Sequence, residues 1–140
     1  MESTFAYHQA FVYVALSAVL CAVLWAPYVV ARLATWGLPT FIHNYAEGFP
    51  AQMPEQPLWA SRSQRAHLNL VETLPPFIGV VLAAAFTGAD VASVTLWATV
   101  FFYARVAHAV VYVVGVPYLR TPVYLASWLA ILMIGVQAIA

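Results

Sequence analysis

A run of polar residues enters one long apolar segment of this sequence and offers the clearest candidate for chemistry. Arg65, Asn69 and Glu72 lie four and three residues apart. At about 100° of rotation per residue they share one face of a helix. Ionisable groups at membrane depth are costly, so they usually face a bundle interior and act on something polar. This stripe is therefore a candidate binding surface.

A second polar stripe has the same character. Arg105, His108 and Tyr112 have the spacing i, i+3, i+7, which again places them on one helical face. Arg120 follows just after Pro117. The two stripes with Arg120 supply three guanidinium groups, a carboxylate, an amide, an imidazole and a phenol. Arginine binds carboxylates bidentately and a glutamate accepts an ammonium group, so the set suits a small polyanion that carries an amine.

Each of these residues also has a purely structural explanation. Arg65 and Glu72 can pair with each other or across a subunit boundary, and Asn69 can join two helices by a hydrogen bond. Arg105 can extend to the membrane interface, and a histidine such as His108 beside a tyrosine is more often structural. For the two stripes together a ligand is favoured, because several buried donors without an anion repel one another.

The elements that must position these stripes are membrane-spanning helices. Hydrophobic residues make up 64% of the 140-residue chain and charged residues only 7%, whereas a soluble domain carries roughly 25% charged residues. A bilayer is crossed by about 20 apolar residues. We predict an all-α, four-helix membrane bundle forming a single domain over 1–140, with a polar, Pro-rich connection over 33–63. The predicted helices cover about 6–31, 64–87, 91–116 and 121–140.

The placement of charge predicts an orientation. The five arginines lie in or toward the first and third connections, which are on the same side of a four-span protein, while the other side carries only Glu2 and Asp90. The positive-inside rule makes the arginine-rich side cytoplasmic and places both termini outside. Membrane lipids are then obligatory partners, and the formal net charge of zero argues against nucleic acid.

Familiar catalytic signatures are missing from the sequence. It has no Ser-His-Asp arrangement and no Gly-rich phosphate loop, and its lone Cys21 is interpreted as a small buried hydrophobe. His8 and His43 are far from the polar stripes, so a metal site is not supported. The chemistry is therefore expected to come from a bound cofactor or substrate.

At this point the residues resemble a known family. The run Arg65-Ala66-His67-x-Asn69-x-x-Glu72-x-x-Pro75-x-Phe77 resembles the signature of the MAPEG family, the membrane-associated proteins in eicosanoid and glutathione metabolism. The run Ala104-Arg105-x-x-His108-x-x-x-Tyr112, followed by Pro117 and Arg120, resembles that family's third helix and following turn. The motifs cover about half of the chain, and the length and four-span layout agree over all of it.

The resemblance implies a homotrimer whose active sites lie between subunits and open toward the cytoplasm. It implies glutathione as co-substrate, gripped by Arg65, Asn69 and Glu72, with a pocket completed by further residues and with an arginine facing the thiol. The pocket residues are Arg105 and Tyr112, and the catalytic candidate is Arg120. Weaker candidates are His108, Arg32 and His67; Arg32 has no local motif, and His67 points away from the Arg65 stripe.

Departures from the family pattern narrow the function. Ser61 stands where an acidic residue is common, while Thr73 and His108 stand where leukotriene-synthase-like members carry tyrosines. The pattern is closest to the microsomal glutathione transferase branch. We therefore expect a glutathione transferase acting on hydrophobic electrophiles, with peroxidase activity as a further possibility.

Two other functions remain as alternatives. A non-catalytic lipid-binding or scaffold member of the same family is the first, although a lipid presenter needs few of the retained polar residues. A proton or ion pathway fits poorly, because the ionisable residues cluster toward one side of the membrane instead of crossing it.

Overall fold

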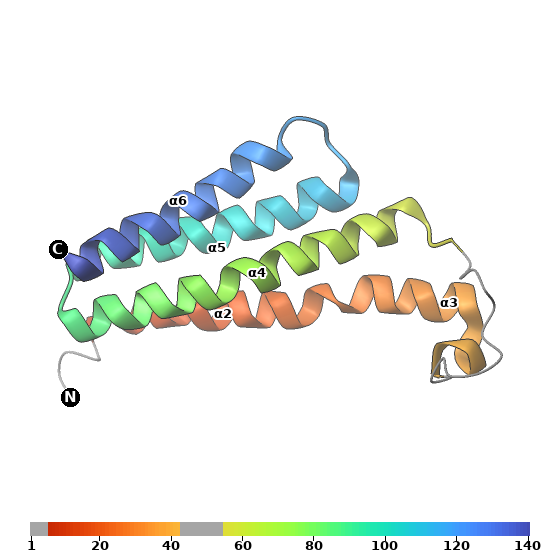
Figure 1. Ribbon diagram of the computed structural model, residues 1–140, viewed down its shortest axis with the longest axis horizontal. Helices are drawn as coiled ribbons and strands as arrows, with labels where there is room; N and C mark the ends of the chain where they lie inside the picture. The colour runs from red at the N-terminus through yellow and green to blue at the C-terminus, as the bar shows by residue number, and fades with distance from the viewer. Residues whose placement is uncertain (1–5, 43–54) are drawn as a thin grey trace.

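The computed structural model describes residues 6–42 and 55–140, and the regular elements within these ranges are α-helices. They are packed side by side along a common long axis (Figure 1). In chain order they are α2 (His8–Leu24), α3 (Ala26–Ile42), α4 (Leu58–Thr87), α5 (Val91–Val114) and α6 (Arg120–Ile139).

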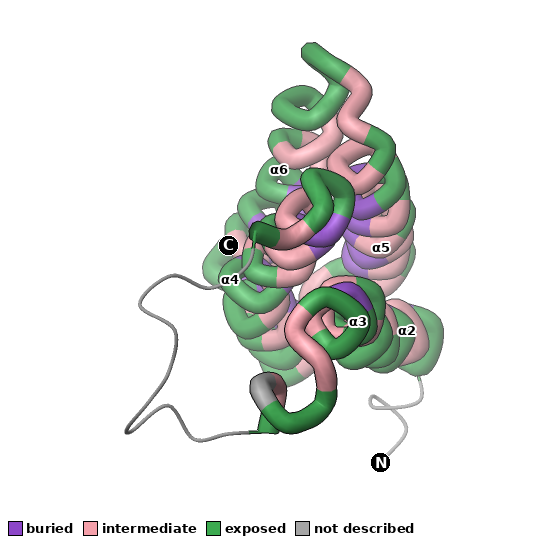
Figure 2. Tube along the Cα trace, turned by 90° about the vertical axis from the view of Figure 1, so that its right-hand side faces the viewer, coloured by how far each residue is buried: buried purple, intermediate pink, exposed green. Residues whose placement is uncertain are grey.

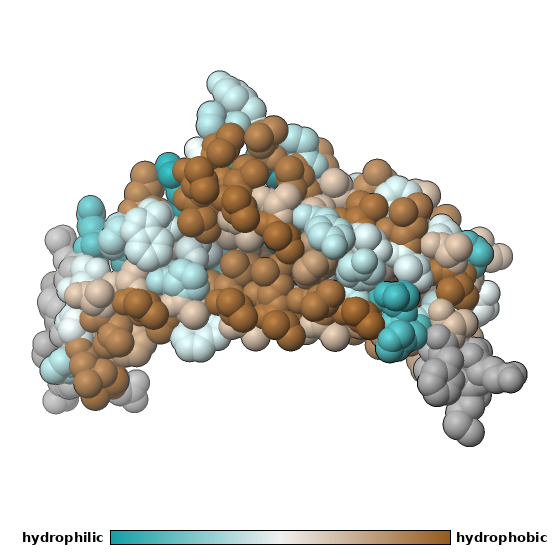
Figure 3. All heavy atoms as spheres, turned by 180° about the vertical axis from the view of Figure 1, so that it is seen from behind, coloured by the Kyte–Doolittle hydropathy of each residue, from teal (hydrophilic) through white to brown (hydrophobic). Residues whose placement is uncertain are grey.

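Within the described residues, four stretches of helix are long and apolar enough to cross a membrane: His8–Pro39, Leu58–Thr87, Val91–Val114 and Arg120–Ile139. The first combines α2 with most of α3, which follow each other across Trp25. Large apolar side chains such as Val19, Phe86 and Leu96 are exposed on the outside of the bundle. Apolar atoms cover most of the middle of the face shown in Figure 3. The prediction of an all-α fold with four spanning helices is confirmed.

The helix ends differ from the predicted bounds on both sides of the long connection. The first helical segment continues to Ile42, past a kink at Gly37, whose φ of 74° and ψ of 158° are not helical. At the other side α4 begins directly after Pro57, six residues before the predicted start at Gln64. Ser61, Arg62 and Ser63 interrupt the apolar pattern in its first two turns, so hydropathy alone does not extend the helix back to Leu58. The predicted connection over 33–63 therefore includes helix at both ends, and residues 43–54 lie outside the described part.

Helix α4 is longer than a membrane requires. Its 30 residues give a length of about 45 Å, against about 30 Å for the hydrocarbon layer. Counting about 20 residues back from Thr87 places the boundary of that layer near Leu68. Arg62 and Arg65 then lie outside the hydrocarbon, and Glu72 lies about one turn inside it.

The core lies where α4, α5 and α6 face one another, with α2 packed on α4 and α5 (Figure 2). In α4 the buried positions Leu70, Phe77, Val81 and Ala84 recur at helical spacing. Phe77 stacks on Phe101 of α5, with ring centroids 3.8 Å apart and planes inclined by 11°. This contact fixes α4 against α5 in the middle of the bundle.

The end of the bundle that holds the α4–α5 turn is closed by local hydrogen bonds. Gly88, with a left-handed φ of 76°, caps the C-terminal end of α4. Asp90 caps the N-terminal end of α5, and its carboxylate accepts a hydrogen bond of 2.8 Å from the Ser93 amide. The Tyr7 hydroxyl donates to the Ala89 carbonyl, which ties the start of the chain to this turn.

At the opposite end the helices separate. Figure 1 shows α6 diverging from α4 toward the turn that joins α5 to α6. That turn holds two residues with positive φ, Gly115 at 82° and Tyr118 at 66°. The five arginines of the sequence lie toward this end, with Arg105 deepest in the bundle.

Candidate functional site

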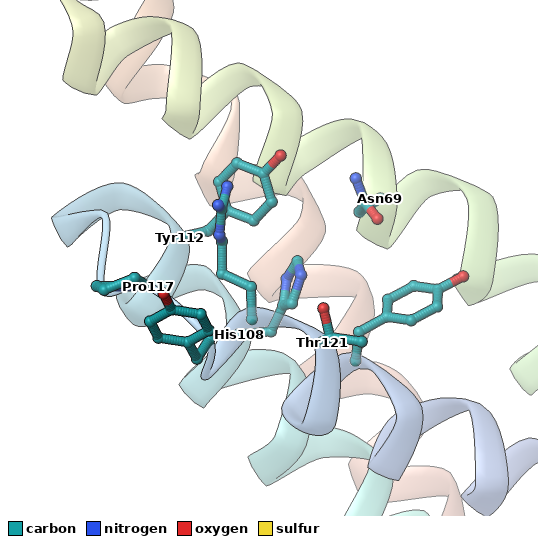
Figure 4. Close-up of a pocket in the computed structure, with 8 residues that line it drawn as sticks. Asn69, His108, Tyr112, Pro117 and Thr121 are labelled. Atoms are coloured by element: carbon teal, nitrogen blue, oxygen red, sulfur yellow. The ribbon is translucent and has the colours of Figure 1, made fainter.

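A polar pocket of about 570 Å³ opens between α4, α5 and the start of α6. It is lined by four of the predicted site residues and four others (Figure 4). The predicted residues in it are Asn69, His108, Tyr112 and Arg120; the others are Pro117, Tyr118, Thr121 and Tyr124. Residues from both predicted stripes therefore converge in one cavity.

The α5 wall of the pocket carries a group of aromatic rings beside a cation. The guanidinium carbon of Arg120 lies 5.0 Å from the centroid of the Tyr112 ring, within cation–π range. His108 is 2% exposed, and its ring centroid is 5.3 Å from that of Tyr112 and 6.0 Å from that of Tyr124. This packing holds Tyr112 and His108 in place, whereas Arg120 is exposed at the first residue of α6 and free to meet a ligand.

Arg105 lies directly behind this wall. Its side chain is 1% exposed, and its Nη1 donates to the Ser127 hydroxyl at 3.4 Å. Its guanidinium carbon lies 5.7 Å from the ring centroid of Tyr124, which lines the pocket. Nε and Nη2 of Arg105 are buried without a hydrogen-bond partner in the described part of the chain. An incompletely paired guanidinium within the bundle is costly, so Arg105 is the least satisfied buried side chain beside the pocket.

On the α4 wall, Asn69 is held by its own helix. Its side-chain Nδ2 donates to the backbone carbonyl of Arg65 at 2.9 Å, and its backbone carbonyl accepts a hydrogen bond from the Thr73 hydroxyl at 2.9 Å. Asn69 Oδ1 stays available as an acceptor for a ligand donor. Thr73 itself is buried and turned to the α4 backbone, so it presents nothing to the pocket.

Two predicted residues of the same stripe lie outside the pocket. Arg65 and Glu72 are exposed, and among residues 6–42 and 55–140 neither forms an ion pair. Their stripe continues that of Asn69 but faces the outside of the single chain. Glu72 also lies about one turn inside the hydrocarbon layer by the count above, where an unpaired carboxylate is costly.

The remaining weaker candidates form a separate cluster between α3 and α4. Arg32 Nη2 donates to Gln64 Oε1 at 2.8 Å, and its guanidinium carbon lies 5.3 Å from the Tyr28 ring centroid. The Tyr28 hydroxyl and His67 Nδ1 share a hydrogen bond of 3.0 Å. The structure therefore does not bring Arg32 and His67 into the pocket.

Three residues that line the pocket were not predicted as site residues, because they belong to no motif. Tyr118 and Thr121 flank Arg120 in the chain, and Tyr124 lies one helical turn after it. The i+4 spacing from Arg120 to Tyr124 was the available signal, since it places both on one face of α6.

The fold and the pocket together define a class: an integral membrane protein with four spanning helices and a polar, arginine-bearing site at one end of the bundle. The model of the MAPEG family matches residues 10–140, and the chain belongs to this family.

Curated relatives agree over a shorter segment. Microsomal glutathione S-transferase 1 of Bos taurus is 36% identical over 56 residues, which cover 40% of this chain and 36% of that protein. The protein of the same name from Rattus norvegicus is 34% identical over 56 residues, with the same coverage. The matched segment thus spans about a third of the length of these relatives.

Proposed function

We propose that this protein is a membrane-bound glutathione transferase that activates the glutathione thiol for attack on apolar electrophiles. The observation that carries the proposal is the convergence of Arg120, Tyr112 and Asn69 in one pocket, backed by the incompletely paired Arg105. Family membership and the names of the curated relatives support the same chemistry.

In this proposal the polar groups divide the work of binding and activation. Arg65 binds one carboxylate of glutathione, Glu72 accepts its ammonium group, and Asn69 accepts a backbone N–H. Arg105, buried behind the pocket wall, contributes to binding through the positive charge that attracts the other carboxylate. Arg120 faces the sulfur, and Tyr112, whose ring lies beside Arg120, closes that side of the pocket. The bound thiol loses its proton to water. The thiolate attacks an electrophilic carbon, and the carbon–sulfur bond forms as the leaving group departs with the electron pair of its bond.

The magnitude of the activation is within reach of a single arginine. A free thiol has a pKa of about 8.5, and lowering it by about two units needs about 3 kcal/mol. One cation at about 4 Å, with an effective dielectric constant near 20, contributes about 4 kcal/mol before desolvation. Arg120 alone suffices on this account.

The exposed Arg65 and Glu72 support a homotrimeric assembly within this proposal. Both continue the stripe of Asn69 on the outside of one chain, where a neighbouring subunit covers them and shares the ligand. The proposal places the arginine-rich end on the cytoplasmic side with both termini outside. Chemical crosslinking and light scattering of the detergent-solubilised protein test the trimer.

The decisive experiment is titration of the purified protein with glutathione, followed by calorimetry and by the ultraviolet absorbance of the thiolate. We expect saturable binding with thiolate formed at neutral pH. In Arg120→Gln the pKa of the bound thiol should rise by about two units, from about 6.5 to about 8.5, so that the thiolate fraction at pH 7 falls roughly 25-fold. Binding should largely persist, and Arg120→Lys, which keeps the charge, should retain part of the activation.

Two outcomes contradict the proposal. Full thiolate formation in Arg120→Gln removes Arg120 from the mechanism. Absence of binding at millimolar glutathione favours the non-catalytic lipid-binding alternative. The same variants with a lipid hydroperoxide test peroxidase activity. In that reaction the thiolate attacks a peroxide oxygen and the O–O bond breaks, which leaves glutathione sulfenic acid and, after protonation, the lipid alcohol. A second glutathione then attacks the sulfenic sulfur to give the disulfide and water.

A further inference from the structure

Arg62 lies in α4 one turn before Arg65, yet its side chain reaches across to α5. Its Nη1 donates to the Val114 carbonyl oxygen at 3.5 Å, at the last residue of that helix. The final carbonyls of a helix have no intrahelical partners, and a cation there interacts favourably with the helix dipole. Arg62 therefore caps α5 from a neighbouring helix.

Gly115 makes this contact possible. It has a φ of 82°, which favours glycine, and a Cβ built on it would lie 2.0 Å from Arg62 Nη1 and 2.5 Å from Arg62 Cζ. The guanidinium thus occupies the space that any side chain at position 115 would need. Because the clash is with the far end of a flexible side chain, a Cβ at this position displaces Arg62 from Val114 without breaking the fold.

Five residues, 115–119, connect the capped end of α5 to Arg120 at the start of α6. The Gly115 and Val116 amides both donate to the Val111 carbonyl, at 3.0 and 3.1 Å, which fixes the exit of the chain from α5. Pro117 has a restricted φ, and its carbonyl accepts the Leu119 amide at 2.8 Å. So short and constrained a turn transmits the position of the α5 end to the start of α6.

We propose that Arg62 is a positioning residue that holds the α5–α6 turn, and through it Arg120, at the distance needed to stabilise the thiolate. The inference rests on the proposed function. Moving a cation from about 4 to about 6 Å from the sulfur removes about a third of its Coulomb interaction. Loss of the cap should therefore raise the pKa of the bound thiol by about one unit, which lowers the thiolate fraction at pH 7 about threefold.

The test compares two glycines that differ only in their surroundings. Gly115 and Gly88 both end helices with a left-handed φ, but a Cβ on Gly88 meets nothing within 4 Å. Gly115→Ala and Gly88→Ala should cause similar losses of thermal stability from backbone strain. Only Gly115→Ala should also raise the pKa of the bound thiol by about one unit and lower kcat about threefold near pH 7. The glutathione affinity at about pH 5, where the bound thiol is protonated in every variant, should change less than about twofold.

Arg62 variants complete the experiment. Arg62→Ala should reproduce the pKa shift of Gly115→Ala, and the double variant should show no larger shift than either single variant, because both remove the same contact. Arg62→Lys keeps a cation at the helix end and should recover part of the thiolate. An unchanged thiol pKa in folded Arg62→Ala, additive shifts in the double variant, or a loss of affinity without a pKa shift overturns the inference.

The wild-type protein separates this failure from that of the proposed function. If the wild type forms thiolate and the variants match it, the positioning role is wrong and the transferase stands. If the wild type forms none, the proposed function fails and the inference fails with it.

Discussion

The two ends of the bundle satisfy their polar groups to different extents. Around the α4–α5 turn, the Tyr7 hydroxyl donates to the Ala89 carbonyl, and the Asp90 carboxylate accepts from the Ser93 amide at the start of α5. Side chains thus provide hydrogen-bond partners for backbone groups at this end. At the arginine-rich end, polar atoms remain buried and without partners. Of six such atoms in the described part of the chain, five belong to Arg32, Gln56, Ser63 and Arg105, and one to Gln137 near the other end. Most of the unpartnered buried polar atoms of the described residues therefore lie toward the arginine-rich end, which is the end that the proposed function assigns to the ligand.

The largest expected effect is a loss of stability from a change between the two ends, in the packed middle of the bundle. Phe77→Ala removes a fully buried ring that stacks on Phe101, and we expect a loss of about 3 kcal/mol or more. Phe86→Ala is the matched control, because Phe86 is 88% exposed on the outside of α4. Unfolding by SDS in mixed micelles measures both, and equal losses would contradict the assigned core.

A smaller effect, a gain of stability, is expected from replacing the buried Arg105 behind the pocket. Replacing buried charged groups with apolar residues of similar volume is often stabilising by about 1–4 kcal/mol. We expect Arg105→Met to raise the stability of the glutathione-free protein while lowering its glutathione affinity. Ser127→Ala, which removes the hydrogen-bond partner of Arg105 Nη1, should instead lower stability by about 1 kcal/mol. Thermal melting with and without glutathione distinguishes the two, and destabilisation by Arg105→Met would mean that Arg105 is structural.

The smallest effect is expected at the closed end. Tyr7→Phe removes the hydrogen bond to the Ala89 carbonyl and should cost about 1 kcal/mol of stability with unchanged turnover per folded molecule. Tyr103→Phe, on an exposed ring of α5, should change neither quantity. A loss of turnover in Tyr7→Phe would show that the two ends are coupled.

The sequence supports the prediction of the fold more fully than that of the site. Long apolar runs predict four spanning helices because a bilayer is crossed by about 20 apolar residues, but the Ser61-Arg62-Ser63 run near the start of α4 interrupts that signal. Helical spacing places Asn69 with Arg65 and Glu72, yet only Asn69 lines the pocket, since a face of one helix is wider than its contact with the next.

Contacts between helices account for most of what the sequence could not predict. Arg62 is three residues from Arg65 and looks like part of the same stripe, but its role depends on where the end of α5 lies. The same holds for Tyr118 and Tyr124, which enter the pocket only because the α5–α6 turn directs them there.

The length of α4 has a consequence for how the proposed transferase would meet its two reactants. A helix that runs about 45 Å, from water into a hydrocarbon layer of about 30 Å, presents one continuous wall to both solvents. Within the proposed function, the protein acts as a phase-transfer catalyst for a peptide that dissolves in water and an electrophile that dissolves in lipid. Its rate should then follow the partition coefficient of the electrophile, so that diluting the protein with more detergent or lipid slows turnover even at constant total substrate.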